Sequence, residues 1–338
     1  MSAQLVTVLL PVHNGARTLQ SSLDSILRQT FRDFELLAID DGSTDESAAI
    51  LRACADPRLR ILANESNIGL MRSLNRGLRE ARGALIARQD ADDLSQPWRL
   101  ERQIDFLAKR PDVVLLGASC WRLSPDGRIT GSNDLPTTHT ALRWASVLDN
   151  PFIHSTVVFR RAIVLDELGG YDESCAICED YEIWNRVAAR HRVANLPDRL
   201  VFYREQPGSM MQSQPEAATL AMRRLLVANL ASVFPGRAFV DEEIDLLSLF
   251  RLRFPVERLA PLVALVERLR ADFLRLNPDA ATNSDFHATV CREELRLAFK
   301  CLGIARGAAL RHIARAFVRS PREWLRQAWT VVAPKPSL

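Results

Sequence analysis

The sequence predicts an α/β protein in which a mostly parallel β-sheet is flanked by helices and followed by an all-helical C-terminal region. Three observations predict this class. Short apolar runs rich in β-branched residues alternate with segments whose apolar residues recur at helical spacing, as in βαβ units. Acidic clusters directly follow two of these runs, at the points where strands of such a sheet would end. Strand patterns stop near residue 217, and helical patterns continue to the end of the 338-residue chain.

The first 120 residues carry five buried strands by this pattern. They are expected at residues 6–12, 34–39, 59–63, 84–88 and 113–119. Four helices are expected between these strands. Apolar residues at helical spacing mark three of them: Leu19, Leu23, Ile26 and Leu27 in the first, Leu70, Leu74, Leu78 and Ala81 in the third, and Leu100, Ile104 and Leu107 in the fourth. The second is expected at residues 46–55. This order predicts parallel strands whose carboxyl ends lie on one edge of the sheet.

The pattern changes after residue 119, where a Ser-Pro-Asp-Gly turn at residues 124–127 predicts a hairpin or a loop. Three further elements are expected: strands at 156–159 and 201–203, and a helix at 179–191. Pro, Gly, Ser and Gln gather at residues 208–216, and we place a domain boundary there. The predicted domains are residues 1–212 and a helical region of residues 213–338.

The composition restricts the class and the location of the protein. The net charge is only +3, from 44 basic and 41 acidic residues, so no nucleic-acid partner is expected. The N-terminus begins with a strand pattern and lacks the basic segment of a signal peptide. No segment approaches the roughly 18 apolar residues that a membrane-spanning helix needs. We therefore expect a cytoplasmic protein, or one that lies peripherally on the cytosolic face of the inner membrane.

The strongest chemical feature is the Asp90-Ala91-Asp92 triplet, which follows a predicted strand. Alternate carboxylates can place hard oxygen ligands around Mg²⁺ or Mn²⁺. Such an ion could bridge the two phosphates of a nucleotide-sugar and neutralise the leaving diphosphate. The alternative is an acidic turn in solvent that caps the next helix.

A second acidic cluster, residues 40–45, stands at another strand-to-helix turn. Its Asp and Ser residues are good helix N-caps and its glycine permits the turn, so one interpretation is a purely structural role. In the functional interpretation, Ser43 or Asp45 caps the helix. Asp41 is then free to accept a hydrogen bond from the base or ribose of a nucleotide.

Glu179 and Asp180 open a predicted helix, where the helix dipole favours acidic side chains. The dipole also keeps a carboxylate ionised, which suits a general base. Sugar transfer needs such a base, because the acceptor hydroxyl loses its proton as it attacks the anomeric carbon. Direct attack from the face opposite the leaving group inverts that carbon.

Three basic side chains lie near these clusters in the sequence. Arg72 and Arg88 are expected either to contact phosphate or to hold a carboxylate in place. His154 is expected either to approach the acceptor or to be a buried histidine with its hydrogen bonds satisfied.

Together these motifs resemble the family-2 inverting glycosyltransferases, which have the GT-A fold. The resemblance covers about the first two thirds of the chain. The matching segments are Pro11-Val12-His13-Asn14, Gln29-Thr30-Phe31 with Phe34-Glu35-Leu36, Asp40 to Asp45, Asn67-Ile68-Gly69-Leu70, Asp90 to Asp93, and Glu179-Asp180-Tyr181 with Trp184. His13 replaces the tyrosine that is usual in the first of these.

The resemblance implies roles for these positions. Asp41 would contact the nucleotide base, Asp92 the divalent metal with Asp90 beside it, and Asp180 would be the catalytic base. The nucleotide pocket would be lined by Pro11, His13 and Asn14, with Asn67 among the donor-binding residues. The implied cofactor is Mg²⁺ or Mn²⁺, and the implied donor is a nucleotide-diphosphate sugar.

Two departures refine this expectation. Many relatives have a histidine that approaches the metal or diphosphate where this chain has Gln206. The Q-x-x-R-W motif of processive synthases is absent after the Glu179-Asp180 element, so we expect one sugar to be added per event. The acceptor would be a glycan or a lipid-linked precursor of a bacterial surface polysaccharide or glycolipid. The alternative is a non-catalytic nucleotide-sugar binding or scaffold protein of the same fold.

The C-terminal third has no family motif, but its last part is basic and amphipathic. Six arginines and one acid lie between Arg306 and Arg326, interleaved with Leu310, Ile313, Phe317, Trp324 and Leu325. Such a helix can lie on an anionic membrane surface, which would make the protein peripheral to the membrane. The alternative is a helix that packs on the catalytic domain with its arginines in solvent.

Overall fold

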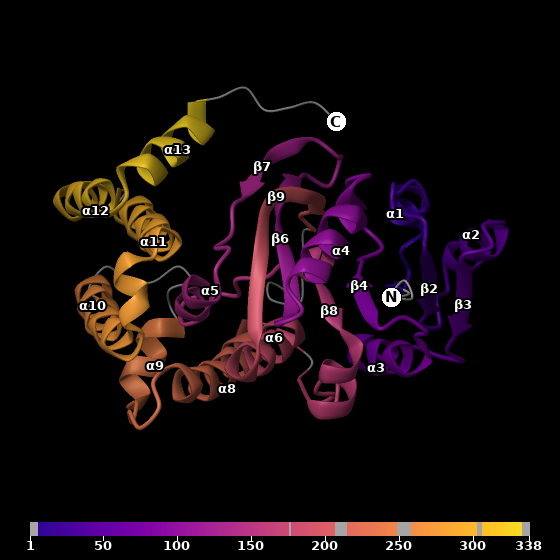
Figure 1. Ribbon diagram of the computed structural model, residues 1–338, viewed down its shortest axis with the longest axis horizontal. Helices are drawn as coiled ribbons and strands as arrows, with labels where there is room; N and C mark the ends of the chain where they lie inside the picture. Colours follow the sequence, from indigo (N-terminus) through magenta and orange to yellow (C-terminus); the bar gives the residue numbers. More distant parts are fainter. Residues whose placement is uncertain (1–5, 176, 207–214, 249–257, 303–305, 333–338) are drawn as a thin grey trace. The chain divides into compact units, whose positions relative to one another are not determined.

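The computed structural model describes residues 6–175, 177–206, 215–248, 258–302 and 306–332. Within these residues, nine strands form one sheet in the order β3-β2-β1-β4-β8-β6-β9-β5, with β7 paired to β6 (Figure 1). Helices lie on both faces of this sheet, and further helices follow it in the sequence. The protein is therefore an α/β protein with a helical C-terminal region, as predicted.

The first four strands of the βαβ pattern lie side by side and run parallel. They are β1 (Val6–Val12), β2 (Phe34–Asp40), β3 (Leu59–Ala63) and β4 (Leu85–Arg88). β1 pairs with β2 on one side and with β4 on the other. Because all four run in one direction, β2, β1 and β4 deliver the chain to the same edge of the sheet.

The rest of the sheet is mixed. β8 (Val158–Arg160) runs antiparallel to both β4 and β6 (Val113–Leu123), and β9 (Arg192–Arg204) runs parallel to β6. The short β5 (Leu94–Ser95) and β7 (Ile129–Asn133) add antiparallel pairs. The turn at residues 124–127 thus joins the hairpin β6–β7. The predicted mostly parallel arrangement holds for the longer strands, because β6 and β9 run in the same direction as β4. β8, which lies between β4 and β6, runs antiparallel to both.

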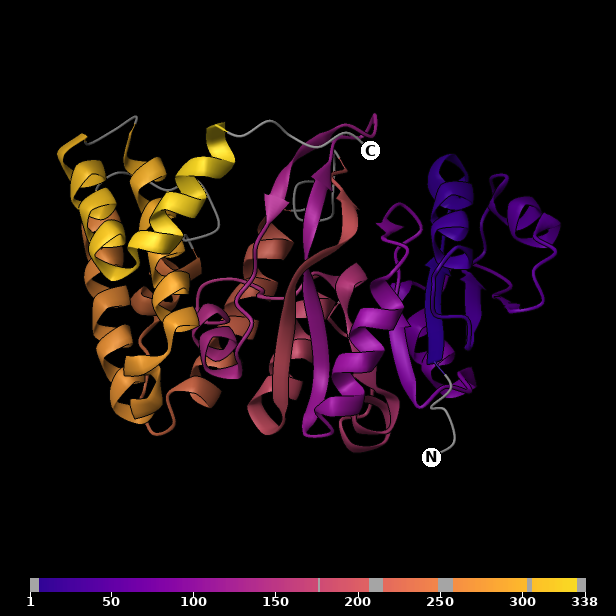
Figure 2. The same cartoon turned by 45° about the horizontal axis from the view of Figure 1, so that its top comes forward.

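β9 is much longer than the strand expected at 201–203, and Figure 2 shows it beside β6. Pro197 and Asp198 interrupt its apolar pattern, so the first half of this strand could not be predicted from the sequence. The register with β6 shifts at this point, because Ala118 pairs with Leu196 while Ser119 pairs with Arg199. A bulge of this kind accommodates residues that a regular ladder would exclude.

The two faces of the sheet bury different helices. One face packs against α1 (Ala16–Leu27), α2 (Ser47–Ala53) and α4 (Arg99–Lys109) through alternate residues of β1, namely Val6, Val8, Leu10 and Val12. The other face is covered by α3 (Leu70–Glu80) and α6 (Glu179–Arg190). At Gly77 of α3 a Cβ would lie 2.4 Å from the Leu9 side chain and 2.5 Å from the Ile39 side chain, so a larger residue there would force both buried side chains to move.

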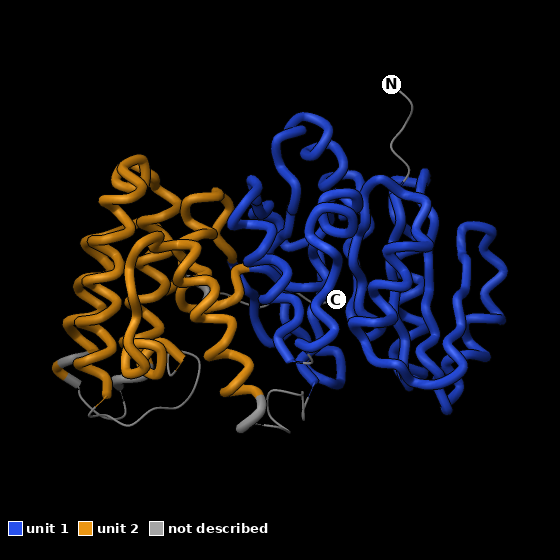
Figure 3. The backbone as a smooth tube through the Cα atoms, turned by 90° about the horizontal axis from the view of Figure 1, so that it is seen from below, with its two compact units in different colours: residues 1–134, 152–214, 337–338 blue, residues 135–151, 215–336 orange. Residues whose placement is uncertain are grey.

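The chain forms two compact units (Figure 3). Among the described residues, the first comprises 6–134 and 152–206, and the second comprises 135–151 and 215–332. The boundary predicted at residues 208–216 falls largely on residues 207–214, which lie outside the described residues. Residues 135–151, which precede β8 in the sequence, belong to the second unit together with the C-terminal helices.

The second unit is helical. Its helices are α5 (His139–Ala145), α8 (Pro215–Val233), α9 (Asp241–Ser248), α10 (Leu259–Leu276), α11 (Ser284–Leu302), α12 (Arg306–Arg319) and α13 (Pro321–Val332). Trp144 of α5 is fully buried against Phe273 and Phe286, with ring centroids 5.5 and 5.9 Å away. In the part of the chain that the structure describes, no helix has the length and apolar character of a membrane span.

Candidate active site

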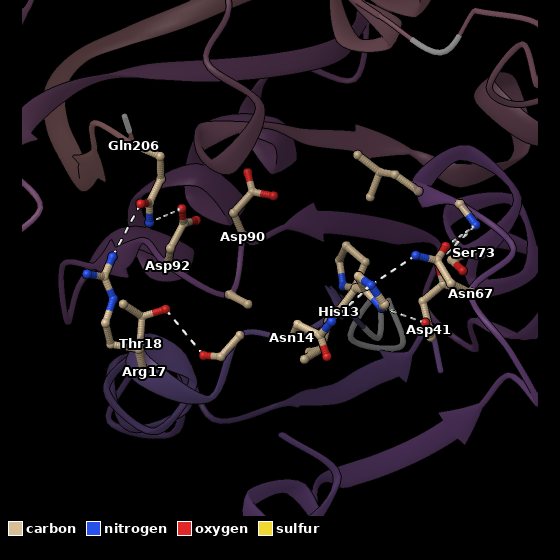
Figure 4. A pocket seen from close by; sticks show the side chains of 16 residues that line it. His13, Asn14, Arg17, Thr18, Asp41, Asn67, Ser73, Asp90, Asp92 and Gln206 are labelled. Carbon is tan, nitrogen blue, oxygen red and sulfur yellow. Dashed lines mark hydrogen bonds between the residues drawn. The ribbon is translucent and has the colours of Figure 1, made fainter. Parts of the chain in front are cut away.

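A pocket of about 620 Å³ lies where β2, β1 and β4 end, within the size range of small-molecule sites. The lining includes seven of the residues predicted from the sequence: Pro11, His13, Asn14, Asp41, Asn67, Asp90 and Asp92. Figure 4 shows two groups of side chains. Asp90 and Asp92 lie toward one end of the pocket, and His13, Asp41 and Asn67 lie toward the other. The structure therefore brings the two acidic clusters into one site.

Asp41 follows β2 and is held by the loop that precedes α3. Its Oδ1 accepts hydrogen bonds from Asn64 Nδ2 at 2.7 Å and from the backbone N–H of Ile68 at 2.9 Å. Its Oδ2 accepts from the N–H of Gly69 at 3.0 Å. Burial opposes ionisation of this carboxyl, but these donors hold its pKa below the usual value. Asp41 is therefore a fixed, ionised acceptor on the pocket wall.

His13 occupies the position beside Asp41, and its surroundings define one tautomer. Nδ1 lies 2.8 Å from the carbonyl oxygen of Asp41, so it carries the proton and donates. Nε2 lies 3.0 Å from Asn67 Nδ2 and 3.2 Å from Asn14 Nδ2, so it accepts. The Asn67 orientation fits this assignment, because Asn67 Oδ1 accepts from the N–H of Gly69 at 2.9 Å. The imidazole thus ties the ends of β1 and β2 to the Asn67 loop.

Arg88 and Asp90 form an ion pair at the end of β4, in which the Arg88 side chain is buried and the Asp90 side chain is partly exposed to the pocket. The Arg88 side chain is fully buried and donates to Asp90 and to the carbonyl of Gln89. Ser155 Oγ donates to Asp90 Oδ2 at 2.6 Å. Burial opposes ionisation of Asp90, but Arg88 and the other neighbours hold its pKa below the usual value. Of the two roles expected for Arg88, the structure shows the one in which it holds a carboxylate. A direct contact between Arg88 and phosphate is not compatible with this burial.

Of the two carboxylates that line this end of the pocket, Asp92 is the one that a cation would stabilise more. Burial, followed by the negative charge of Asp90, raises the pKa of Asp92. Both oxygens of Asp90 already accept protein hydrogen bonds, whereas among the described residues the Asp92 carboxylate accepts one side-chain hydrogen bond, from Gln206 Nε2 at 3.0 Å from Oδ2. A divalent ion beside Asp92 would remove the electrostatic cost of two adjacent carboxylates.

The donor set fits such an ion, because Mg²⁺ and Mn²⁺ prefer carboxylate oxygens. Among the described residues, no group of three or more His, Cys, Asp or Glu side chains forms a closed metal site. That is the usual situation for Mg²⁺, which takes one or two carboxylates and completes its shell with substrate phosphates and water. Asp92 would hold the ion, with Asp90 beside it.

Glu179 and Asp180 stand at the start of α6, outside the lining of the pocket. Burial, followed by the charge of Asp180, raises the pKa of Glu179 to about 8, and the charge of Asp90 acts in the same direction. The Asp180 carboxylate accepts from the N–H of Tyr181 at 2.7 Å. At neutral pH Glu179 therefore holds a proton.

Of the two roles predicted for His154, the structure shows the one in which the ring is largely buried and hydrogen-bonded. Its Nε2 lies 3.0 Å from the Tyr171 hydroxyl, and its Nδ1 lies 4.0 Å from Glu179 Oε1. Burial, followed by the charge of Arg88, lowers the pKa of His154 to about 3. The ring is therefore neutral, and it packs between Tyr171 and Trp184 beneath the start of α6.

Two features of the site were not found in the sequence. Arg72 pairs with Glu173 at 3.2 Å and does not line the pocket, whereas Arg17 of α1 does. Gln206, noted only as a departure from the family pattern, lines the pocket between Arg17 and Asp92. The one sequence feature that could have indicated Arg17 as a pocket residue is its position on the first turn of the helix that follows the Pro11-Asn14 segment.

The chain is similar to known glycosyltransferases. The profile described as Glycosyl transferase family 2 matches residues 7–166. An uncharacterized glycosyltransferase of Haemophilus influenzae is 29% identical over 210 residues, which are 59% of this chain and 65% of that protein. The amylovoran biosynthesis glycosyltransferase AmsE of Erwinia amylovora is 34% identical over 58% of this chain and 75% of its own length.

The match extends further in a third relative. The O-antigen biosynthesis glycosyltransferase WbnJ of Escherichia coli is 29% identical over 66% of this chain and 89% of its own length. Among solved structures, S. aureus TarS in complex with UDP-GlcNAc superposes with a TM-score of 0.56. The superposition covers 96% of this chain and 92% of that one at 17% sequence identity, so it shows the shared GT-A fold.

Proposed function

Because the chain belongs to glycosyl transferase family 2, we propose that it moves one sugar from a nucleotide-diphosphate sugar to an acceptor hydroxyl with inversion of the anomeric carbon. One observation carries the proposal. Asp41, Asp90 and Asp92 come from two separate strand ends and line one pocket. An ionised hydrogen-bond acceptor at one end and a carboxylate pair at the other suit a ligand with a base and a diphosphate.

The base end of the donor would lie between His13, Asn67 and Asp41. The carboxylate of Asp41 can accept a hydrogen bond from a ring N–H of the base, because the loop donors keep it ionised. The imidazole of His13 offers an exposed flat surface on the same side. Pro11 and Asn14 complete this wall, as the resemblance implies.

The diphosphate end would lie over Asp92. A divalent ion bound there, Mg²⁺ or Mn²⁺, would neutralise charge on the diphosphate and favour its departure. The protein's part is to hold Asp92 at the pocket through Gln206 and to fix the adjacent Asp90 through Arg88 and Ser155. These contacts orient the acidic pair before the donor arrives.

Asp180 would remove the acceptor proton. As the acceptor oxygen forms its bond to the anomeric carbon, the proton passes to Asp180, and the bond from that carbon to the β-phosphate oxygen breaks with its electron pair left on phosphate. Glu179, whose pKa of about 8 keeps it protonated at neutral pH, adds no second negative charge there. The base therefore acts from the helix end while the leaving group is held at the pocket.

The acceptor would be a glycan or lipid-linked precursor of a bacterial surface polysaccharide or glycolipid. This part of the proposal is supported by relatives described as glycosyltransferases of amylovoran and O-antigen biosynthesis. Each addition would add a single sugar, because the sequence lacks the motif of processive synthases.

An anionic membrane surface is the proposed partner of the C-terminal helices, and would place the protein on the cytosolic face of the inner membrane. Leu310, Phe317, Val318 and Leu325 are exposed on α12 and α13, by 67%, 47%, 80% and 58%. Arg311 and Arg322 are exposed on the same two helices. Apolar side chains beside arginines favour the interface of an anionic bilayer. Co-sedimentation with phosphatidylglycerol vesicles, and not with neutral phosphatidylcholine vesicles, is the expected result.

Turnover of nucleotide-sugars tests the enzymatic proposal. UDP-, GDP-, dTDP- and CDP-sugars are incubated with Mn²⁺ and the released nucleotide is measured, with the product configuration read by NMR. Release with inversion is expected from the wild type. Asp92→Ala should abolish it, and Asp180→Asn should reduce it by roughly 10² to 10⁴. If all three proteins bind a nucleotide-sugar equally and none turns it over, the chain is a non-catalytic binder or scaffold of the same fold.

A further inference from the structure

Charge in the donor pocket is unbalanced. The lining contains the carboxylates of Asp41, Asp90 and Asp92. Among the described residues of the lining, Arg17 is the one with a guanidinium group. A diphosphate brings two further negative charges, and its leaving oxygen gains another as the glycosidic bond breaks. One divalent ion beside two carboxylates leaves part of this charge uncompensated, so a cationic side chain is needed close to the phosphates.

The other arginines near the site are committed elsewhere. Arg88 is fully buried and holds Asp90. Arg72 pairs with Glu173 outside the lining. Arg17, in contrast, lies in the first turn of α1 with an exposed side chain that borders the pocket.

Gln206 connects Arg17 to the metal-binding end of the pocket. The Arg17 guanidinium donates through an Nη to Gln206 Oε1 at 3.3 Å, and Gln206 Nε2 donates to Asp92 Oδ2 at 3.0 Å. Figure 4 shows the Gln206 amide joined by dashed lines both to the Arg17 guanidinium and to the Asp92 carboxylate. A side-chain amide can make both contacts at once because it has a donor and an acceptor on one plane. The guanidinium is thus aimed at the end of the pocket that Asp92 occupies.

We propose that Arg17 binds the diphosphate of the donor directly and that Gln206 positions it, an inference that rests on the proposed function. Arg17 would donate two N–H groups to oxygens of the β-phosphate, in the fork geometry that guanidinium groups make with phosphate. Because charge on that phosphate increases as the sugar leaves, the contact strengthens toward the transition state. Gln206 keeps the guanidinium over the pocket while no donor is bound.

Calorimetric binding to the full chain tests the proposal. UDP, GDP, dTDP and CDP are titrated first, with Mn²⁺, to find the diphosphate that the wild type binds. That nucleoside diphosphate and its bare nucleoside are then titrated against Arg17→Ala, Arg17→Lys and Gln206→Ala. Arg28→Ala is the matched control, because Arg28 follows the same helix, its side chain is 79% exposed, and the ion pair it makes within the described residues, with Asp24, is long, at 3.9 Å.

Arg17→Ala is expected to weaken binding of the nucleoside diphosphate by about ten-fold or more, the range of a hydrogen-bonded charge. Binding of the bare nucleoside should not change, and the loss should persist when EDTA replaces Mn²⁺. Arg17→Lys should recover part of the affinity, Gln206→Ala should show a smaller loss, and Arg28→Ala should match the wild type.

Two results would overturn the inference alone: wild-type affinity of Arg17→Ala for the diphosphate, or an equal loss for diphosphate and bare nucleoside. The second would show that Arg17 supports the pocket as a whole. If the wild type binds none of the four diphosphates, the proposed function fails, and the role of Arg17 fails with it.

Discussion

Trp144 Nε1 donates a hydrogen bond of 2.9 Å to Glu293 Oε2, although the two residues are 149 positions apart in the chain. The contact joins α5 to α11 inside the helical unit. Both side chains are buried, so this carboxyl has left water and has the indole N–H as its side-chain donor. Two of the predictions below follow from this pair.

Stability of the protein should depend on pH through Glu293. Burial raises its pKa to about 7, above the unfolded value of 4.5. Between these values the folded state retains a proton that the unfolded state has lost, so the contribution is complete below about pH 4.5 and is lost as the pH rises through 7. Glu293→Gln keeps an acceptor for Trp144 but cannot ionise. The thermal midpoint of the wild type should therefore fall relative to that of Glu293→Gln as the pH is raised from 5 to 8. A constant difference across that range would contradict the prediction, and Glu242→Gln, at an exposed position, serves as the control.

A chain shortened to residues 1–214 should aggregate. It keeps α5 but lacks Phe273 and Phe286, against which Trp144 packs. Trp144 and Leu142, both buried in the full chain, would then be exposed together. Analytical ultracentrifugation should show aggregates, and a companion with Leu142→Ser and Trp144→Ser should show fewer. A monomeric 1–214 chain with wild-type thermal stability would argue against this role of α5.

Gly42→Ala should destabilise the protein more than Gly169→Ala does. Both glycines have positive φ, 64° and 79°, which costs about 1–2 kcal/mol for any other residue. A Cβ at Gly42 would also lie 2.5 Å from the carbonyl carbon of Ser66, whereas one at Gly169 meets nothing within 4 Å. Urea denaturation should rank the two losses in unfolding free energy, and nucleotide affinity should fall only for Gly42→Ala, since the clash displaces the loop that holds Asp41. Equal losses for both variants would rule out the close approach.

Asp180→Asn should reduce kcat by roughly 10² to 10⁴, the usual contribution of a general base. Glu179→Gln should reduce kcat at pH 7 by less than about ten-fold, because the amide resembles the protonated form that Glu179 adopts below its pKa of about 8. Steady-state kinetics with a fixed donor and acceptor measures both. The reverse order of effects would assign the base to Glu179.

Asp92→Asn should abolish the metal-dependent part of donor binding. A ligand at one hundred times its Kd stabilises the folded state by about 2.7 kcal/mol, which gives a shift of several degrees in the thermal midpoint. The wild type should show this shift with donor and Mn²⁺ together, and Asp92→Asn should show the smaller shift that donor gives in EDTA. Asp126→Asn, in the exposed β6–β7 turn, should behave as the wild type. A full shift in Asp92→Asn would place the metal elsewhere.

Local sequence patterns are enough to predict the order and type of most elements of the first unit. Alternating apolar runs and helical stripes are local patterns, and β1, β2 and β3 occur where those patterns predict them. The same local logic placed Asp41 and Asp90 just after parallel strands. Because such strands end on one edge, their meeting in one pocket could be expected before the fold was known.

Burial and long-range contacts, in contrast, depend on how distant parts of the chain pack together. Arg88 and Arg17 look alike in the sequence, but β4 buries the first and α1 leaves the second at the pocket. Gln206 takes its place in the site through hydrogen bonds to Asp92, 114 residues earlier, and to Arg17, 189 residues earlier. The α5 segment is too short for a clear helical period, and its place depends on Glu293 and two phenylalanines far along the chain. Sequence periodicity shows which face of a helix or strand is apolar. The packing of distant segments determines which element covers that face and which charged side chains beside it stay exposed.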